Sequence, residues 1–163
     1  MKKYSTEDTL QHSRIKKADF PSNPEARLDS AQMKCNPIAD ANIPYRNLSS
    51  PVTKAKSIGQ LIDSLDVSSS IRYQRTEEDT YCNVYAYDFC HFCKVYLPTV
   101  WWTENALEKL ATGQEVEAIY GNTVDRIYSS AIHDWFIEWG ADFGWERFFD
   151  VDELQKRVNA NGG

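Results

Sequence analysis

The uneven placement of aromatic residues most constrains how this 163-residue chain can fold. Only Tyr4, Phe20 and Tyr45 precede residue 57, whereas all five tryptophans and the remaining aromatic residues follow it. Five of the six prolines lie in the first third of the chain. Large aromatic side chains dominate protein cores, and a chain of this length supports one modest core. We therefore predict an extended, Pro-containing arm over residues 1–56 and one compact domain over residues 57–163.

Charge follows the same division. Residues 1–56 contain 10 Lys/Arg and 6 Asp/Glu, and the remainder contains 8 Lys/Arg and 18 Asp/Glu. An acidic body offers no basic stripe for phosphates, so we expect no nucleic-acid partner. No stretch reaches the roughly 20 apolar residues of a membrane span, and no apolar run follows the N-terminal lysines. We expect synthesis in the cytoplasm without a cleavable signal peptide, and cysteines that stay reduced.

Apolar spacing indicates a mainly helical body. Apolar residues recur at helical intervals in five segments, with plausible capping residues such as Thr103 before and Gly113 after the third. The five predicted helical segments are residues 57–67, 80–95, 103–113, 122–139 and 150–161. Residues 115–121 alternate weakly, as in a short strand, and the segment around Pro98 is expected to be extended or a turn. The predicted fold class is α+β with little strand.

The stretch "TYCNVYAYDFCHFC" (80–93) holds three cysteines and one histidine. In one helix, residues 82 and 93 would lie about 16 Å apart along the axis. Zinc bonds are about 2.0–2.3 Å long, so we expect no metal site and no cofactor. A Cys90–Cys93 disulfide inside a helix would be strained. Both residues share a helix face with Ala86 and Phe89, which predicts small buried core residues.

Cys82 differs from these two because of its position. If Thr80 caps the helix, Cys82 lies in the first turn, where unpaired N–H groups and the helix dipole stabilise a thiolate. A cysteine nucleophile would be built at such a position. A buried structural cysteine at a helix start is the alternative, and position alone does not decide between them.

Two motifs carry a resemblance to a known family. The segments "TYCNVYAYDF" and "YSSAIHDWFIEWGADFGWERF" resemble the NlpC-type papain-like cell-wall hydrolases over about residues 60–160. The resemblance implies the helix-rich N-terminal lobe of a papain-like fold and a cysteine peptidase or amidase. Its substrates would be amide bonds in peptidoglycan stem peptides. Cys82 would be the nucleophile, N–H groups at the start of its helix would bind the oxyanion, and Asn83 would position the helix start or the substrate.

The histidine of this family lies on a strand after the last helix, in a Gly-His segment that this sequence lacks before Gly163. A fragment, a degenerate form and the use of another base all remain open. His91 would lie about 13.5 Å from Cys82 along one helix, too far to contact the thiol. His133 is the candidate base, although the adjacent Asp134 is expected to point elsewhere. His12 would need the arm to fold over the site.

Tyr81, Trp101 and Trp102 are candidates for a substrate groove, with packing in the core as the alternative. Under the enzyme hypothesis, the family implies an exported antibacterial effector, with an immunity or secretion partner, or a phage-type lysin. The alternative hypothesis is a non-catalytic binding module derived from such a hydrolase. That module would bind a partner or a cell-wall fragment through an acidic, Trp-rich surface.

Overall fold

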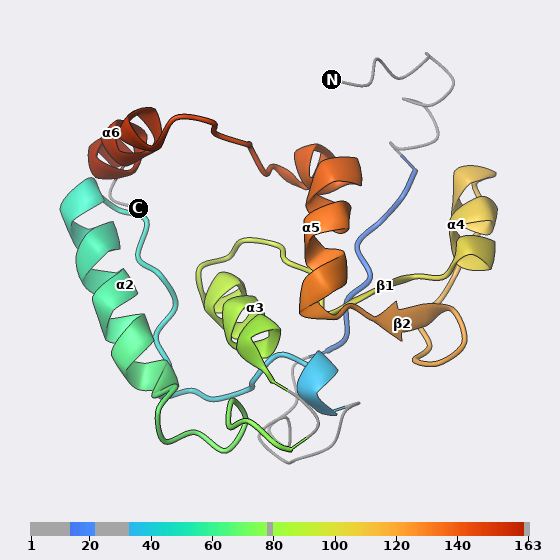
Figure 1. Cartoon of the computed structure of the whole chain (residues 1–163), viewed down its shortest axis with the longest axis horizontal. Coiled ribbons are helices and arrows are strands. Elements are labelled where there is room, and N and C mark those ends of the chain that lie inside the picture. Colours follow the sequence, from blue (N-terminus) through green and yellow to red (C-terminus); the bar gives the residue numbers. More distant parts are fainter. Residues whose placement is uncertain (1–13, 22–32, 78–79, 162–163) are drawn as a thin grey trace. The chain divides into compact units, whose positions relative to one another are not determined.

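The computed structural model describes residues 14–21, 33–77 and 80–161. Within these ranges the chain forms five α-helices, two 3-10 helices and one two-stranded sheet (Figure 1). The elements in chain order are η2 (Met33–Cys35), α2 (Pro51–Leu65), α3 (Cys82–Phe92), β1 (Val100–Trp102), α4 (Glu104–Ala111), β2 (Val124–Arg126), α5 (Ser129–Glu138), η3 (Gly140–Phe143) and α6 (Val151–Asn161). This α+β composition with little strand agrees with the predicted class, and the papain-like arrangement stays a prediction.

The chain divides into two compact units, each built from segments distant in sequence. Unit 1 contains Met1–Pro21 and Pro98–Trp145, and unit 2 contains Ser22–Leu97 and Glu146–Gly163. This division differs from the boundary expected at residue 57. Described parts of the expected arm supply buried side chains to both cores, Ile15 and Ala18 in unit 1 and Cys35, Ile38 and Ile43 in unit 2. These apolar residues are scattered through a segment poor in aromatic residues and rich in proline, so composition did not reveal them.

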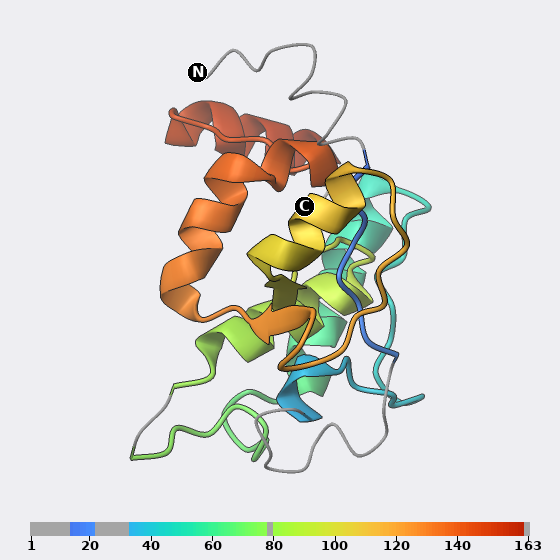
Figure 2. The same ribbon diagram turned by 90° about the vertical axis from the view of Figure 1, so that its right-hand side faces the viewer.

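Unit 1 is organised around the antiparallel pair β1–β2, which Figure 2 shows from a second side. Val100 pairs with Arg126, and Trp102 pairs with Val124. Thr103 caps α4 as predicted, because its hydroxyl accepts a hydrogen bond from the Ala106 N–H. The sheet therefore leads directly into α4 after β1 and into α5 after β2.

The helix predicted over residues 122–139 is only partly present. Its first part is β2 and α5 begins at Ser129, so the prediction was wrong for residues 122–128. The strand suggested at 115–121 is also absent from the described sheet, apart from an isolated bridge between Tyr120 and Val124. Residues 124–126 form a strand because their backbone pairs with β1. The spacing of apolar residues along the chain does not reveal such long-range pairing.

The segment 14–21 is held on unit 1 by polar contacts. Arg14 Nη1 donates at 2.9 Å to the carbonyl of Ala111, the last residue of α4. Trp102 Nε1 donates to the Lys16 carbonyl at 2.7 Å, and Lys16 Nζ pairs with Glu115 at 3.0 Å. This part of the expected arm is therefore a built-in component of unit 1.

Unit 2 contains α2, α3 and α6. The start of α2 was predicted at Ser57 but lies at Pro51, with Ser50 as the N-cap. Proline suits the first helical position because that N–H has no helical partner in any case. Ser57 lies inside the helix, where its hydroxyl accepts from the Asn47 N–H and donates to the Lys54 carbonyl.

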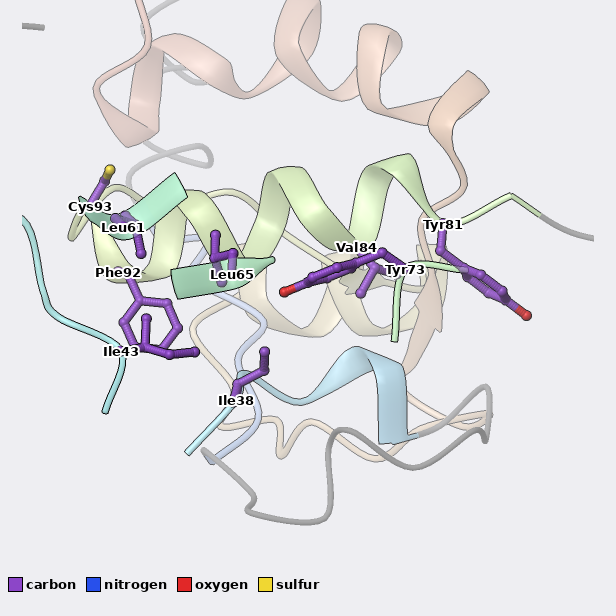
Figure 3. Close-up of a cluster of buried hydrophobic side chains, with 9 residues drawn as sticks. All are labelled: Ile38, Ile43, Leu61, Leu65, Tyr73, Tyr81, Val84, Phe92 and Cys93. Atoms are coloured by element: carbon purple, nitrogen blue, oxygen red, sulfur yellow. The ribbon is translucent and has the colours of Figure 1, made fainter. Parts of the chain in front are cut away.

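The main core of unit 2 lies where α2 and α3 pack together (Figure 3). Its buried members come from α2, α3 and the loops beside them, and they are Ile38, Ile43, Leu61, Leu65, Tyr73, Tyr81, Val84, Phe92 and Cys93. The helix predicted near residues 150–161 is present as α6, and Asp150 caps it by accepting from the Asp152 N–H at 2.8 Å. None of the described helices has the length and apolar content to cross a membrane.

Candidate functional site

The start of α3 is the candidate site. Cys82 is its first helical residue, so the thiol lies in the first turn as predicted. The N-cap is Tyr81 rather than the expected Thr80, and the Tyr81 side chain forms no capping hydrogen bond. The Tyr81 carbonyl accepts from the N–H groups of Val84 and Tyr85 at 3.0 and 3.1 Å. Tyrosine is not a capping residue, so other contacts of Tyr81 must hold the helix start in place.

The four cysteines are all thiols, but their surroundings differ. Cys82 is exposed, Cys35 and Cys93 are buried, and Cys90 is partly buried. Burial raises the pKa of Cys90 to about 12, with the nearby Cys93 adding to the rise and Arg46 opposing it. Burial also raises the pKa of Cys93 above its ordinary value. Cys82 is therefore the one cysteine of the four with an exposed side chain.

No described group of three or more His, Cys, Asp or Glu side chains is placed to hold a metal ion. Among the described residues, the start of α3 offers an exposed thiol beside backbone N–H groups. Such a thiol can act as a nucleophile, and the N–H groups can stabilise a negative oxygen.

The residues on either side of Cys82 are buried. Tyr81 and Asn83 are each 8% exposed, so little of either side chain is accessible. The ammonium of Lys34 lies 3.2 Å from the centroid of the Tyr81 ring, and Lys34 itself is 1% exposed. The structure thus brings Tyr81, Cys82 and Asn83 together at one helix end. The substrate-binding roles predicted for Tyr81 and Asn83 stay predictions.

A buried ion pair anchors the middle of α3. Asp88 accepts from Arg72 Nε at 2.6 Å, from Arg72 Nη2 at 3.1 Å and from the Tyr73 hydroxyl at 2.9 Å. Arg72 Nη2 also donates to the carbonyls of Lys34 and Asn36 at 3.2 and 2.8 Å. Burial raises the pKa of Asp88, and the bonds from Arg72 and Tyr73 oppose that rise.

Sequence reasoning missed Lys34, Arg72 and Asp88. The available signal was Asp88, a single carboxylate inside the otherwise apolar and aromatic run of the α3 helix. A carboxylate in such a run predicts a buried cationic partner, because an unpaired buried charge is strongly unfavourable.

The candidate base His133 lies on α5 in unit 1, whereas Cys82 lies in unit 2. Its Nδ1 is 3.3 Å from Asp134 Oδ1, and both side chains are largely exposed. The expectation that Asp134 points away from His133 was therefore wrong, because both side chains can bend toward each other at the helix surface. An acceptor at Nδ1 favours the tautomer whose Nε2 can take a proton.

His91 is the only histidine of the sequence that falls within unit 2. It lies nine residues after Cys82 on α3, which corresponds to about 13.5 Å along the axis. Its Nε2 is 3.3 Å from the Tyr45 hydroxyl. Unit 2 therefore contains no histidine that can contact the Cys82 thiol. His12 lies outside the described residues.

Trp101 and Trp102 belong to the core of unit 1. The ring of Trp101 lies 5.5–5.6 Å from those of Trp135, Trp139 and Phe143. Trp102 is buried and its indole N–H bonds to the Lys16 carbonyl. This packing agrees with the alternative that both residues fill the core. The substrate groove predicted for them stays a prediction.

Comparison with protein-family models, with curated proteins and with solved structures gives no match to this chain. The resemblance to NlpC-type hydrolases therefore rests on the two sequence motifs alone.

Proposed function

We propose that this chain is a cysteine hydrolase that cleaves amide bonds in peptidoglycan peptides, with Cys82 as the nucleophile. One observation carries the proposal: the only exposed thiol is also the first residue of a helix. The substrate class rests on the resemblance of the two motifs to NlpC-type hydrolases. The same resemblance supports an exported effector or a phage-type lysin as the biological setting.

The proposed reaction has two steps. The Cys82 thiolate attacks the amide carbonyl carbon, and N–H groups of the first turn of α3 stabilise the negative oxygen. The carbon–nitrogen bond then breaks, and the amine leaves with a proton from the general acid. Water hydrolyses the resulting thioester, which releases the carboxylate and restores the thiol.

The proton transfers need a base, and His133 is the proposed one. The contact with Asp134 supports this assignment, because a carboxylate at Nδ1 orients the ring.

The second candidate is a non-catalytic binding module. The observation that favours it is that unit 2, which holds Cys82, has no histidine able to contact the thiol. Without proton transfer, hydrolysis would be slower by about 10²–10⁴-fold. Such a module would bind cell-wall fragments without cleaving them.

Purified cell walls test both candidates together. The full chain, Cys82→Ala, His133→Ala and the control Cys90→Ala would be incubated with them, and released fragments with new amino groups would be quantified. We expect release by the full chain and by Cys90→Ala, no release by Cys82→Ala, and a loss of about 10²–10⁴-fold for His133→Ala.

Sedimentation with the same cell walls separates the candidates. Binding of the wild type and of Cys82→Ala, with no fragments from either, would establish the binding module and reject the enzyme. Absence of both binding and release would reject both candidates.

A further inference from the structure

Helix α2 carries apolar side chains on two separate faces. One face holds Leu61 and Leu65, which are buried in the main core of unit 2 (Figure 3). The other face carries Val52 and Ile62, which are 80% and 44% exposed. A helix at a protein surface normally has one apolar stripe, with polar residues on the opposite side. The exposed apolar face of α2 is therefore a candidate surface for a partner.

The outward face of α2 consists of Val52, Ala55, Gly59 and Ile62, all of which are exposed. They are spaced by three, four and three residues, which places them within about 80° of one another around the helix. The spacing is symmetric about position 57, with the larger side chains at the ends and the smaller residues between them. A Cβ added to Gly59 would meet nothing within 4 Å, so the backbone there is open to a close approach.

The symmetric spacing makes the outward face of α2 complementary to itself. When two copies of the helix lie antiparallel across a two-fold axis at position 57, Val52 of one copy faces Ile62 of the other. Ala55 of one copy then faces Gly59 of the other. Small residues thus meet at the crossing point, where the distance between the helix axes depends on side-chain size. A second copy of the chain therefore covers the whole face with apolar contacts.

Two charges along one edge of this face fit the same arrangement. Lys56 and Asp63 are both exposed and lie about 20° apart around the helix. They are about 10.5 Å apart along the axis, and neither side chain has an ion-pair partner among the described residues.

The antiparallel pair brings these charges together across the two-fold axis. Lys56 of one copy and Asp63 of the other then lie about 7.5 Å apart along the axis. Helical side chains tilt toward the N-terminus of their own helix, so in antiparallel helices these two lean toward each other. Each copy therefore supplies the opposite charge for the other, and the symmetry forms this contact twice.

We propose that the outward face of α2 is a contact between two copies of this chain, arranged antiparallel about a two-fold axis. The occupant is a second copy because the apolar spacing and the charges are both complementary to themselves. Four apolar residues a side are far fewer than the roughly 20–30 of a standard interface, so the dimer is weak, with a dissociation constant at or above about 1 μM. The contact involves neither Cys82 nor His133 and goes beyond the function proposed above.

Analytical ultracentrifugation of the full chain, from about 5 μM to about 500 μM, measures the dissociation constant. Lys56→Glu and Asp63→Lys each reverse one charge, and the double variant carries both changes and keeps the net charge of the wild type. Ile62→Ser removes an apolar contact without a large change in helix propensity. Ile71→Ser is its matched control, because Ile71 is exposed and lies outside α2. Circular dichroism establishes that each variant is folded.

We expect the wild type to dimerise as its concentration rises. Each single charge reversal should raise the dissociation constant about tenfold, because like charges then face each other at two symmetric contacts. The double variant should recover the wild-type value. An equimolar mixture of the two single variants should dimerise more tightly than either alone, because the introduced glutamate of one copy meets the introduced lysine of the other. Ile62→Ser should raise the constant at least about tenfold, and Ile71→Ser should leave it unchanged.

A wild type that stays monomeric over the whole concentration range would overturn the proposal. A double variant as weak as the single variants, or a mixture no tighter than its components, would also do so, because Lys56 and Asp63 would then not meet. If Ile62→Ser does not fold, the charge variants decide alone, since both of their positions are exposed. Cell-wall hydrolysis is a separate readout, so its absence would reject the enzyme proposal without changing these constants.

Discussion

Cys82 and Cys90 carry the same functional group in opposite surroundings. They lie on one helix, eight residues apart, yet Cys82 is exposed at its start and Cys90 is partly buried near its end. Burial at Cys90 raises the pKa to about 12, so this thiol stays protonated at neutral pH. The first-turn position of Cys82 and the apolar face that contains Cys90 could be predicted from spacing, whereas the role of Cys82 as a nucleophile stays a prediction.

The first prediction concerns relative thiol reactivity. With limiting iodoacetamide at neutral pH, Cys82 should be alkylated at least about tenfold faster than Cys35, Cys90 or Cys93, because only exposed, ionisable thiols react readily. Peptide mass spectrometry at early times measures the four rates. Equal alkylation of all four in the folded protein would show that the exposed position does not matter.

The second prediction concerns pH and Cys90. An unfolded-state thiol ionises near its ordinary value of 9.0, whereas folding raises the pKa of Cys90 to about 12. The folded state therefore holds this proton more tightly, so its contribution to stability is complete below pH 9 and is lost as pH rises toward 12. Between about pH 9 and 10, the free energy of unfolding should fall more steeply for the wild type than for Cys90→Ala. Urea denaturation at each pH measures this free energy, and an equal fall with pH in the two proteins would contradict the raised pKa of Cys90.

The third prediction concerns the buried Arg72–Asp88 pair. Removing one charge leaves the other buried without its partner, so Asp88→Asn should lower the free energy of unfolding by about 3–5 kcal/mol. Glu146→Gln is the control, because it breaks the exposed pair with Arg157 and should cost less than about 1 kcal/mol. Urea denaturation measures both, and equal costs would refute a structural role for burial of the pair.

At the scale of elements, the sequence predicted helix ends correctly where capping residues next to the helix determine them. Helix α4 begins after its predicted cap, Thr103, and Gly113 follows it with a φ of +82°. Helix α5 and strand β2 could not be separated from sequence, because the strand depends on pairing with residues more than twenty positions away. The start of α2 was missed because Pro51 was assigned to the arm, although proline is favoured at a first helical position.

The fourth prediction belongs to α2. Gly59 lies inside this helix, and a Cβ added there would meet nothing within 4 Å. Gly59→Ala should therefore raise the free energy of unfolding by about 0.5–1 kcal/mol. Gly144→Ala is the contrasting control, because its φ of +86° disfavours a side chain and the variant should be less stable. Thermal denaturation would contradict this account if both substitutions shifted the midpoint in the same direction.

At the scale of the whole molecule, long-range assembly is what the sequence could not reveal. Each unit joins an N-terminal segment to a distant one, and contacts such as Trp102 with Lys16 or Arg72 with Lys34 link residues far apart in the chain. Composition therefore placed the core boundary at residue 57, whereas single buried residues before it belong to both units. The position of Cys82 in the first turn of α3 was predictable because a helix start is local, but the buried contacts among Lys34, Arg72 and Asp88 were not.

The most direct test of the central claim is the mass of the protein during turnover. The full chain would be mixed with purified peptidoglycan peptides, quenched in acid and digested for peptide mass spectrometry. The account predicts a substrate-derived acyl group on the peptide that contains Cys82, and neither adduct nor hydrolysis with Cys82→Ala. Hydrolysis by Cys82→Ala at the wild-type rate, or an acyl group on another cysteine, would contradict it.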